Sequence, residues 1–114
     1  MTSPVTFWQI VTPQPDESAA FYSRLFDWRI GAGNELHSGS ERGIDGGVWP
    51  APTEAQSFVQ LFIEVADVDA TIARGSSLGA KVLVPKMPAP GGGEVAILHD
   101  PFGLSFGVVS KRVD

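Results

Sequence analysis

The sequence predicts an α+β protein built from two βαβββ units in tandem, and three observations lead to this expectation. Short apolar stretches rich in β-branched and aromatic residues alternate with turn residues along the chain. In each half, one stretch with helical spacing follows directly after the first strand candidate. The second half also repeats the order of the first, with Asp16 aligned to Asp69. We therefore expect one domain over residues 1–114, with units at residues 5–50 and 57–110.

The first unit begins with the apolar stretch FWQIV and continues into a helix. Asp16 is expected as the N-cap of this helix, and Glu17 suits the positive end of the helix dipole. A sheet-facing stripe is predicted at the helical spacing i, i+4, i+7 and i+8, which corresponds to Ser18, Tyr22, Leu25 and Phe26. The elements expected in this unit are a strand at 7–11, the helix at 16–26, and strands at 28–30, 35–38 and 44–49.

The second unit follows the Pro-rich segment Pro50–Gln56, which is typical of a linker. Asp67 is expected to cap the second helix and Gly79 to follow its last turn. The stretch Asp100–Gly103 has the proline and glycine of a tight turn before the last strand. The elements expected here are a strand at 58–65, a helix at 67–78, and strands at 81–84, 95–99 and 105–109.

The alternation of side chains along each strand separates two faces. The aliphatic face is expected to pack on the helices, and it carries Trp8, Ile10, Leu61, Ile63, Val65, Phe106 and Val108. The opposite face mixes amides, aromatic rings, a carboxylate and a glycine, which suits the wall of a ligand cavity better than the middle of a core.

Composition and charge exclude several classes of function. The chain has 114 residues, no cysteine and a net charge of −5, so a disulfide framework and a thiolate nucleophile are excluded, and a nucleic-acid partner is disfavoured. No apolar run is long enough to span a membrane, and the first residues do not form a secretory signal. We expect a cytoplasmic protein whose ligand is neutral or cationic.

Several motifs in order resemble the vicinal oxygen chelate superfamily, which includes glyoxalase I, extradiol dioxygenases and bleomycin resistance proteins. These motifs are FY followed by LFDW in the first unit, VADVDATIARGSSLGAKV in the second, and the closing DPFGLSFGV. The resemblance covers residues 5–110. It implies that each unit is a curled mixed sheet forming half of a cup-shaped cavity, with one helix per unit on the outside. It also implies a divalent metal site in the enzyme members, with ligands on the first and last strands of the units.

At the positions that match the family's metal ligands, this chain lacks strong metal donors. The first-strand positions correspond to Phe7 and Gln60, and the last-strand positions to Gly46 or Gly47 and to Gly107. Only the amide of Gln60 could coordinate, and a neutral amide is a weak ligand compared with histidine or carboxylate. We expect no metal and no cofactor, and a cup with additional room beside Gly107.

Other residues are candidates for ligand binding or acid–base chemistry. Glu64 lies on the mixed face and could serve as a general base, and His99 could serve as an acid or base. For His37 and His99, an ordinary hydrogen-bonding role remains the alternative. The residues expected to line the ligand site are Phe7, Gln9, Trp49, Gln60, Phe62, Ser105 and Gly107.

Three functions remain open at this point. The first is a metal-independent protein that binds a neutral or cationic small molecule, aromatic ones included, as a carrier or drug-sequestering protein would. The second is a lyase- or isomerase-type enzyme that uses Glu64 or His99, with amide hydrogen bonds from Gln9 and Gln60. The third is an interaction module whose cup is vestigial. In each case a homodimer is expected, because a chain this small leaves sheet edges and apolar surface uncovered.

Overall fold

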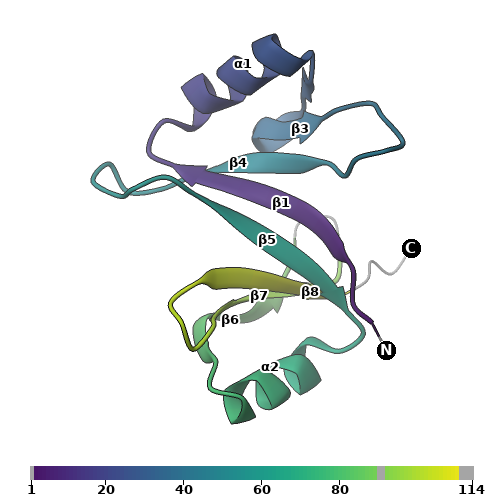
Figure 1. Cartoon of the computed structure of the whole chain (residues 1–114), viewed down its shortest axis with the longest axis vertical. Coiled ribbons are helices and arrows are strands. Elements are labelled where there is room, and N and C mark those ends of the chain that lie inside the picture. The colour runs from purple at the N-terminus through teal and green to yellow at the C-terminus, as the bar shows by residue number, and fades with distance from the viewer. Residues whose placement is uncertain (1, 90–91, 111–114) are drawn as a thin grey trace. The chain divides into compact units, whose positions relative to one another are not determined.

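The computed structural model describes residues 2–89 and 92–110, and it divides into two compact units. The first unit comprises Thr6–Gln60, and the second comprises the chain from Leu61 onward together with the residues before Thr6. The order of helices and strands repeats βαβββ twice, as the sequence predicts (Figure 1). The fold class is therefore confirmed as α+β.

The first unit places one helix, α1, against a mixed four-stranded part of the sheet in the order β2-β3-β4-β1. Strands β1 and β4 are parallel, and the other neighbouring pairs are antiparallel. Its elements are β1 (Val5–Thr12), α1 (Pro15–Phe26), β2 (Arg29–Ile30), the short 3₁₀ helix η1 (Ala32–Asn34), β3 (Glu35–His37) and β4 (Gly46–Pro50).

Helix α1 begins one residue earlier than predicted, and its cap differs from the prediction. The N-cap is Gln14, without a side-chain cap, because Pro15 takes the first helical position and needs no amide partner. Asp16 thus lies inside the first turn, where its carboxylate accepts a hydrogen bond of 2.9 Å from the Asn34 side-chain amide. The prediction of Asp16 as N-cap is wrong, although its carboxylate still lies at the positive end of the helix.

The core of the first unit forms between α1 and one face of the sheet. Its buried members are Ala19, Leu36 and Val48, and Trp8, Ile10, Tyr22 and Trp28 pack against them. The predicted orientation of Trp8 and Ile10 toward the helix is confirmed. Leu25 and Phe26, which the helical pattern placed on the buried stripe, are instead 58% and 52% exposed, because the buried face of α1 is centred on Ala19.

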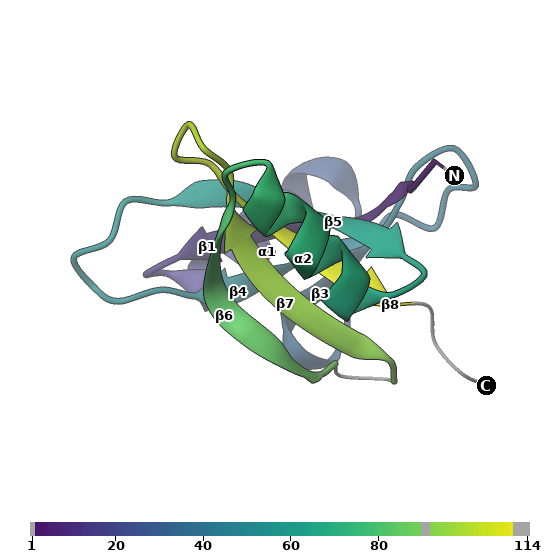
Figure 2. The ribbon, with the colours of Figure 1, turned by 90° about the horizontal axis from the view of Figure 1, so that it is seen from below.

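The second unit has the same arrangement around α2, with strand order β5-β8-β7-β6. Strands β5 and β8 are parallel, whereas β8 with β7 and β7 with β6 are antiparallel. Figure 2 shows α2 lying across this part of the sheet, where it contacts β6, β7 and β8. The elements are β5 (Phe58–Val65), α2 (Val68–Ser77), β6 (Lys81–Pro88), β7 (Glu94–His99) and β8 (Ser105–Ser110).

Both predicted ends of α2 are confirmed. The Asp67 carboxylate accepts a hydrogen bond of 3.0 Å from the Ala70 amide, which satisfies one free amide of the first turn. Gly79 follows the helix with φ of 101°, a left-handed conformation that favours glycine. The core beneath α2 consists of Val65, Val68, Ala96, Leu98 and Val108, with Ile63, Ile72, Ala80 and Phe106 packed against it.

One residue of β5 departs from the predicted core. Leu61 is 46% exposed, whereas Ile63 and Val65 on the same face pack into the core. The alternation of side chains along β5 therefore assigned the correct faces. The core begins at Ile63 and not at Leu61, because the buried cluster beneath α2 contacts the end of β5 that precedes the helix.

The turns between strands follow the predicted chemistry. In the turn before β8, the Asp100 carboxylate accepts hydrogen bonds from the amides of Leu104 and Phe102, at 3.0 and 2.7 Å, and these bonds lower the pKa of Asp100. Strands β6 and β7 are antiparallel neighbours, and residues 90–91 of the segment between them lie outside the described part. No helix in the described residues is long and apolar enough to cross a membrane.

Candidate functional site

The face of the first unit that points away from α1 carries most of the predicted ligand-binding residues. In the parallel pair β1–β4, Gln9 lies beside Gly47 and Val11 beside Trp49. Phe7 shares this face of β1, and β3 adds Glu35, which lies beside Gly47. Gln60 joins the group because its side-chain amide donates a hydrogen bond of 3.3 Å to Oε1 of Gln9.

The two glycines of β4 point to opposite faces, which decides between the two candidates for the last-strand position. A Cβ on Gly46 would lie 2.1 Å from ring atoms of Trp8, on the core side. A Cβ on Gly47 would lie 3.2 Å from the ring of Phe7, on the side away from α1. Of the two candidates, only Gly47 therefore lies on the face that carries the predicted ligand-binding residues.

In the second unit a phenyl ring also lies against a last-strand glycine, and this contradicts the expected cavity beside Gly107. Phe62 on β5 lies beside Gly107 on β8, and a Cβ on Gly107 would approach the Phe62 ring to 2.3 Å. Both residues are buried, with Phe62 only 7% exposed. The expectation of additional room there is wrong, because the neighbouring phenyl ring occupies the space in front of the glycine. A ligand at this position would contact Phe62 before Gly107.

The side chains at the matched positions do not fit a divalent metal. Gly47 and Gly107 have no side chain to donate, and phenyl rings lie against both of them. The one donor side chain, Gln60, is 6% exposed and bonded to Gln9. Divalent ions in proteins require carboxylate, imidazole or thiolate ligands for tight binding. Within residues 2–89 and 92–110, no group of three or more such side chains is arranged to hold a metal.

The predicted acid–base candidates of the second unit, Glu64 on β5 and His99 on β7, lie beside opposite ends of β8. His99 lies beside Ser105 and Glu64 beside Val109, with Phe62 and Gly107 between them. Ser105 and Val109 are four residue steps apart along the strand, which corresponds to about 13 Å. Glu64 and His99 are therefore too far apart to act together on one reacting atom.

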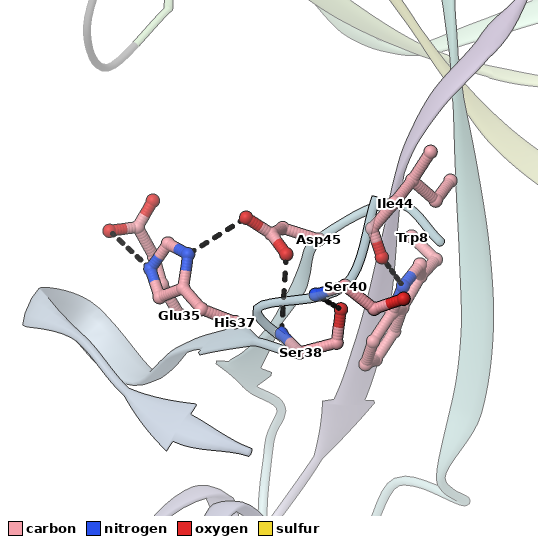
Figure 3. A network of polar contacts seen from close by, with 7 residues as sticks. All are labelled: Trp8, Glu35, His37, Ser38, Ser40, Ile44 and Asp45. Carbon is pink, nitrogen blue, oxygen red and sulfur yellow. Dashed lines mark hydrogen bonds and ion pairs between the residues drawn. The ribbon is translucent and has the colours of Figure 1, made fainter. Parts of the chain in front are cut away.

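Sequence reasoning missed the most organised polar group in the first unit, which surrounds His37 (Figure 3). Nδ1 of His37 lies 2.8 Å from Oδ2 of Asp45, and Nε2 lies 3.9 Å from Oε1 of Glu35. The hydrogen bond from His37 is the main reason that the pKa of Asp45 is lowered. The spacing of Glu35 and His37, two apart on a strand, was the signal that placed both on one face.

Backbone geometry holds this histidine in position. A Cβ on Gly31 would lie 2.9 Å from Nε2 of His37, so the imidazole fits only because residue 31 has no side chain. The Asp45 carboxylate also accepts a hydrogen bond of 3.4 Å from the Ser38 amide, which fixes it beside the ring. The result is an imidazole oriented by a carboxylate at one nitrogen, with 25% of its side chain exposed.

The model of the glyoxalase-like domain matches residues 5–109 of this chain. The chain belongs to the glyoxalase-like domain family. The resemblance to the vicinal oxygen chelate superfamily is thus confirmed.

Among curated relatives, proteins named "Putative glyoxylase CFP32" from Mycobacterium bovis and Mycobacterium tuberculosis are each 26% identical to this glyoxalase-like chain over 108 residues. The aligned region covers 89% of this chain and only 41% of each relative. The chain therefore spans about two fifths of their length.

Solved structures of the same fold include two enzymes. Methylmalonyl-CoA epimerase from Mycobacterium tuberculosis superimposes with a TM-score of 0.73 at 14% identity, covering 96% of this chain and 88% of the epimerase. The Mn(II)-bound glyoxalase from Novosphingobium aromaticivorans has a TM-score of 0.68 at 22% identity, covering 98% of this chain and 41% of that chain. At these identities the similarity establishes the fold.

Proposed function

We propose that this glyoxalase-like chain binds a small neutral or cationic organic molecule without a divalent metal. The observation that supports it most directly is the replacement of the family's ligand positions by a phenyl-covered glycine and a paired amide, at Gly47 and Gln60. This face of the first unit offers apolar contact and amide hydrogen bonds, the combination typical of small-molecule sites.

Trp49 supports an aromatic or cationic ligand. Its side chain lies on the same face as Gln9 and is 56% exposed, so the indole is available for stacking or for a cation–π contact. The carboxylates of Glu35 and Asp45 and the net charge of −5 also favour a cation.

Thermal-shift screening of aromatic amines and related cations tests this proposal, each compound being measured with EDTA and with added Mn²⁺. A ligand that binds the folded state raises the melting temperature, and we expect the same shift under both conditions. A shift that occurs only with Mn²⁺ would contradict metal independence. If no compound gives a shift, even at millimolar concentration, the binding proposal fails.

Two variants and one control locate the site once a compound is found. Trp49→Ala and Gln60→Ala should each raise the dissociation constant, by about tenfold for a loss near 1.4 kcal/mol. Phe102→Ala, at a turn residue that is 91% exposed in the second unit, should leave it unchanged. Equal weakening by all three variants would place the ligand elsewhere.

His37 supports a second candidate, an enzyme of the isomerase or lyase type that moves a proton. Its hydrogen bond to Asp45 places the ring proton on Nδ1 and leaves Nε2 as the basic atom, which is the arrangement that a general base needs. This replaces the less organised candidates Glu64 and His99 as the residue to test.

Because a neighbour of the same fold is named methylmalonyl-CoA epimerase, an acyl-CoA thioester with an acidic α-proton is a suitable probe. The test is incorporation of deuterium from D₂O into methylmalonyl-CoA, followed by mass spectrometry. Wild-type protein and His99→Gln should exchange the proton, and His37→Gln should not. Exchange by none of them, or equally by all of them, would contradict this candidate.

A further inference from the structure

The face of the second unit that points away from α2 carries an apolar row with a carboxylate at one end. Four residues lie directly beside one another on the adjacent strands β5, β8, β7 and β6, namely Glu64, Val109, Val95 and Met87. Residues that lie side by side on neighbouring strands share a face of the sheet. Since Ala96, the neighbour of Val95 in sequence, is buried in the core beneath α2, these residues lie on the other face. We call these four residues the Glu64 row.

A register shift in β6, of the β-bulge type, places Met87 in the Glu64 row. On β6, Val84 lies beside Ile97 of β7. Met87, three residues further on, lies beside Val95, which is only two residues from Ile97. In a regular strand, side chains three residues apart point to opposite faces. The shift therefore brings Met87 to the same face as Val84, and bulges that re-aim a side chain in this way are frequent next to functional sites.

Lys86 holds this part of β6 from the other side of the sheet. Its Nζ lies 2.6 Å from Oδ2 of Asp69 on α2 and 3.4 Å from Oε2 of Glu94 on β7. The hydrogen bond to Asp69 is the main reason that the pKa of Lys86 is raised. Because Asp69 belongs to the helix that covers the opposite face, Lys86 points away from the Glu64 row and leaves Met87 facing it.

The Glu64 row is accessible, and its carboxylate is unpaired. Met87 is 47% exposed, and the other three residues are partly buried. Glu64 forms no salt bridge with any residue that the structure describes. A partly buried carboxylate at the end of an apolar strip is complementary to a cationic group attached to an apolar body. Three strand spacings separate Glu64 from Met87, which corresponds to about 14 Å.

We propose that the Glu64 row binds an alkyl chain that carries one ammonium group. The ammonium lies beside Glu64, and the chain crosses the two valines and ends at Met87. Methionine suits the end of a chain, because its flexible thioether adapts to irregular apolar shapes. A second cationic group would meet no carboxylate at that end of the row, which favours a monocation. This site lies in the second unit and does not rest on the proposed function, whose residues lie in the first.

Isothermal titration calorimetry with decyltrimethylammonium, below its micelle concentration, tests the charge. Wild-type protein should bind it, and Glu64→Gln should raise the dissociation constant by at least about tenfold, since the ammonium loses its counter-ion. Decyl sulfate has the same chain and the opposite charge, so wild-type protein should bind it at least about tenfold more weakly. Glu64→Lys should reverse this preference. Leu78→Ala, at a 68% exposed leucine at the end of α2, is the control and should bind as wild type does.

The length of the chain tests the Glu64 row itself. Affinity should rise from butyl- to decyltrimethylammonium, because each added methylene buries apolar surface, and should level off once the chain passes Met87. Met87→Ala should raise the dissociation constant of the decyl compound by about fivefold. It should leave that of hexyltrimethylammonium unchanged, because a hexyl chain beside Glu64 ends before Met87.

Lys86 is a positioning residue in this arrangement, since it acts through Met87. Lys86→Met should weaken binding of the decyl compound and leave the hexyl compound unaffected, a difference that a general loss of stability would not produce. Lys86→Arg keeps the cation and should bind both compounds as wild type does. Circular dichroism confirms that each variant is folded.

Four results would overturn the proposal. The first is a wild-type protein that does not bind decyltrimethylammonium, or binds decyl sulfate equally well. The second is unchanged affinity in folded Glu64→Gln. The third is an effect of Met87→Ala that is equal for the hexyl and decyl compounds. The fourth is loss of binding in Trp49→Ala with Glu64→Gln unaffected, which would place the cation on the first unit, as the proposed function requires.

Discussion

Gly107 offers the most direct test of how the strands pack, because its neighbour leaves no room for a side chain. A Cβ there would lie 2.3 and 2.4 Å from two ring atoms of Phe62, whereas ordinary Cβ contacts are 3.4–4 Å. The ring must therefore move by about 1 Å, and Phe62 is buried. Gly107→Ala should lower the free energy of unfolding by about 1–3 kcal/mol, the usual cost of overpacking.

A second substitution separates this clash from other effects of losing a glycine. Phe62→Ala alone should cost about 3–5 kcal/mol, because it removes a buried ring. In the Gly107→Ala/Phe62→Ala double variant the new methyl group has no ring to meet, so the two costs should not add. We expect a coupling free energy of about 1–3 kcal/mol that favours the double variant.

Urea unfolding followed by tryptophan fluorescence measures all three variants. Gly43→Ala is the control, because a Cβ at that position would meet only the Ser38 hydroxyl at 4.0 Å, and its effect should be within about 0.5 kcal/mol of zero. If Gly107→Ala is as mild as Gly43→Ala, or if the costs at 107 and 62 add fully, then Phe62 does not cover Gly107 and the reasoning is refuted.

Two further predictions concern the core and the His37 group. Leu98→Ala should cost about 2–5 kcal/mol of unfolding free energy, because Leu98 is 1% exposed beneath α2, while Leu61→Ala should cost clearly less. Equal costs in urea unfolding would mean that Leu61 is buried. The lowered pKa of Asp45 stabilises the fold above the ordinary carboxyl pKa, and this stabilisation is lost as pH falls through the lowered value. Asp45→Asn should therefore lose less stability than wild type between pH 6 and pH 2, and parallel pH profiles would contradict the Asp45–His37 contact.

The repeated order of helices and strands could be predicted from local patterns alone. Alternation along β1, β5 and β8 also assigned the correct faces, as shown by Ile10, Ile63 and Val108 packing toward the helices. Asp67 and Gly79 marked the ends of α2 because capping depends on residues close in the sequence. These features need no knowledge of which strands lie side by side.

The contacts at the candidate site join residues from different strands and loops, and the sequence pattern does not show which of these residues meet. Nothing in the strand from Ser105 to Ser110 indicates that a ring from β5 covers Gly107, because Phe62 lies far away in the sequence. Asp45, similarly, lies just before β4 and only the folded chain brings its carboxylate to His37. The position of Leu25 on α1 was misassigned because its apolar character fits either side of the helix.

The sequence by itself determined the α+β class, the repeated βαβββ order and the ends of α2, since these follow from residue type and local spacing. The tertiary structure alone decided that glycines 47 and 107 lie beneath aromatic rings, that His37 is oriented by Asp45, and that Leu25 and Phe26 on α1 face outward. The physical reason is that residue type sets the size, polarity and hydrogen-bonding groups of a side chain. Strand register and helix rotation set which partner it meets, and these result from packing the whole unit at once.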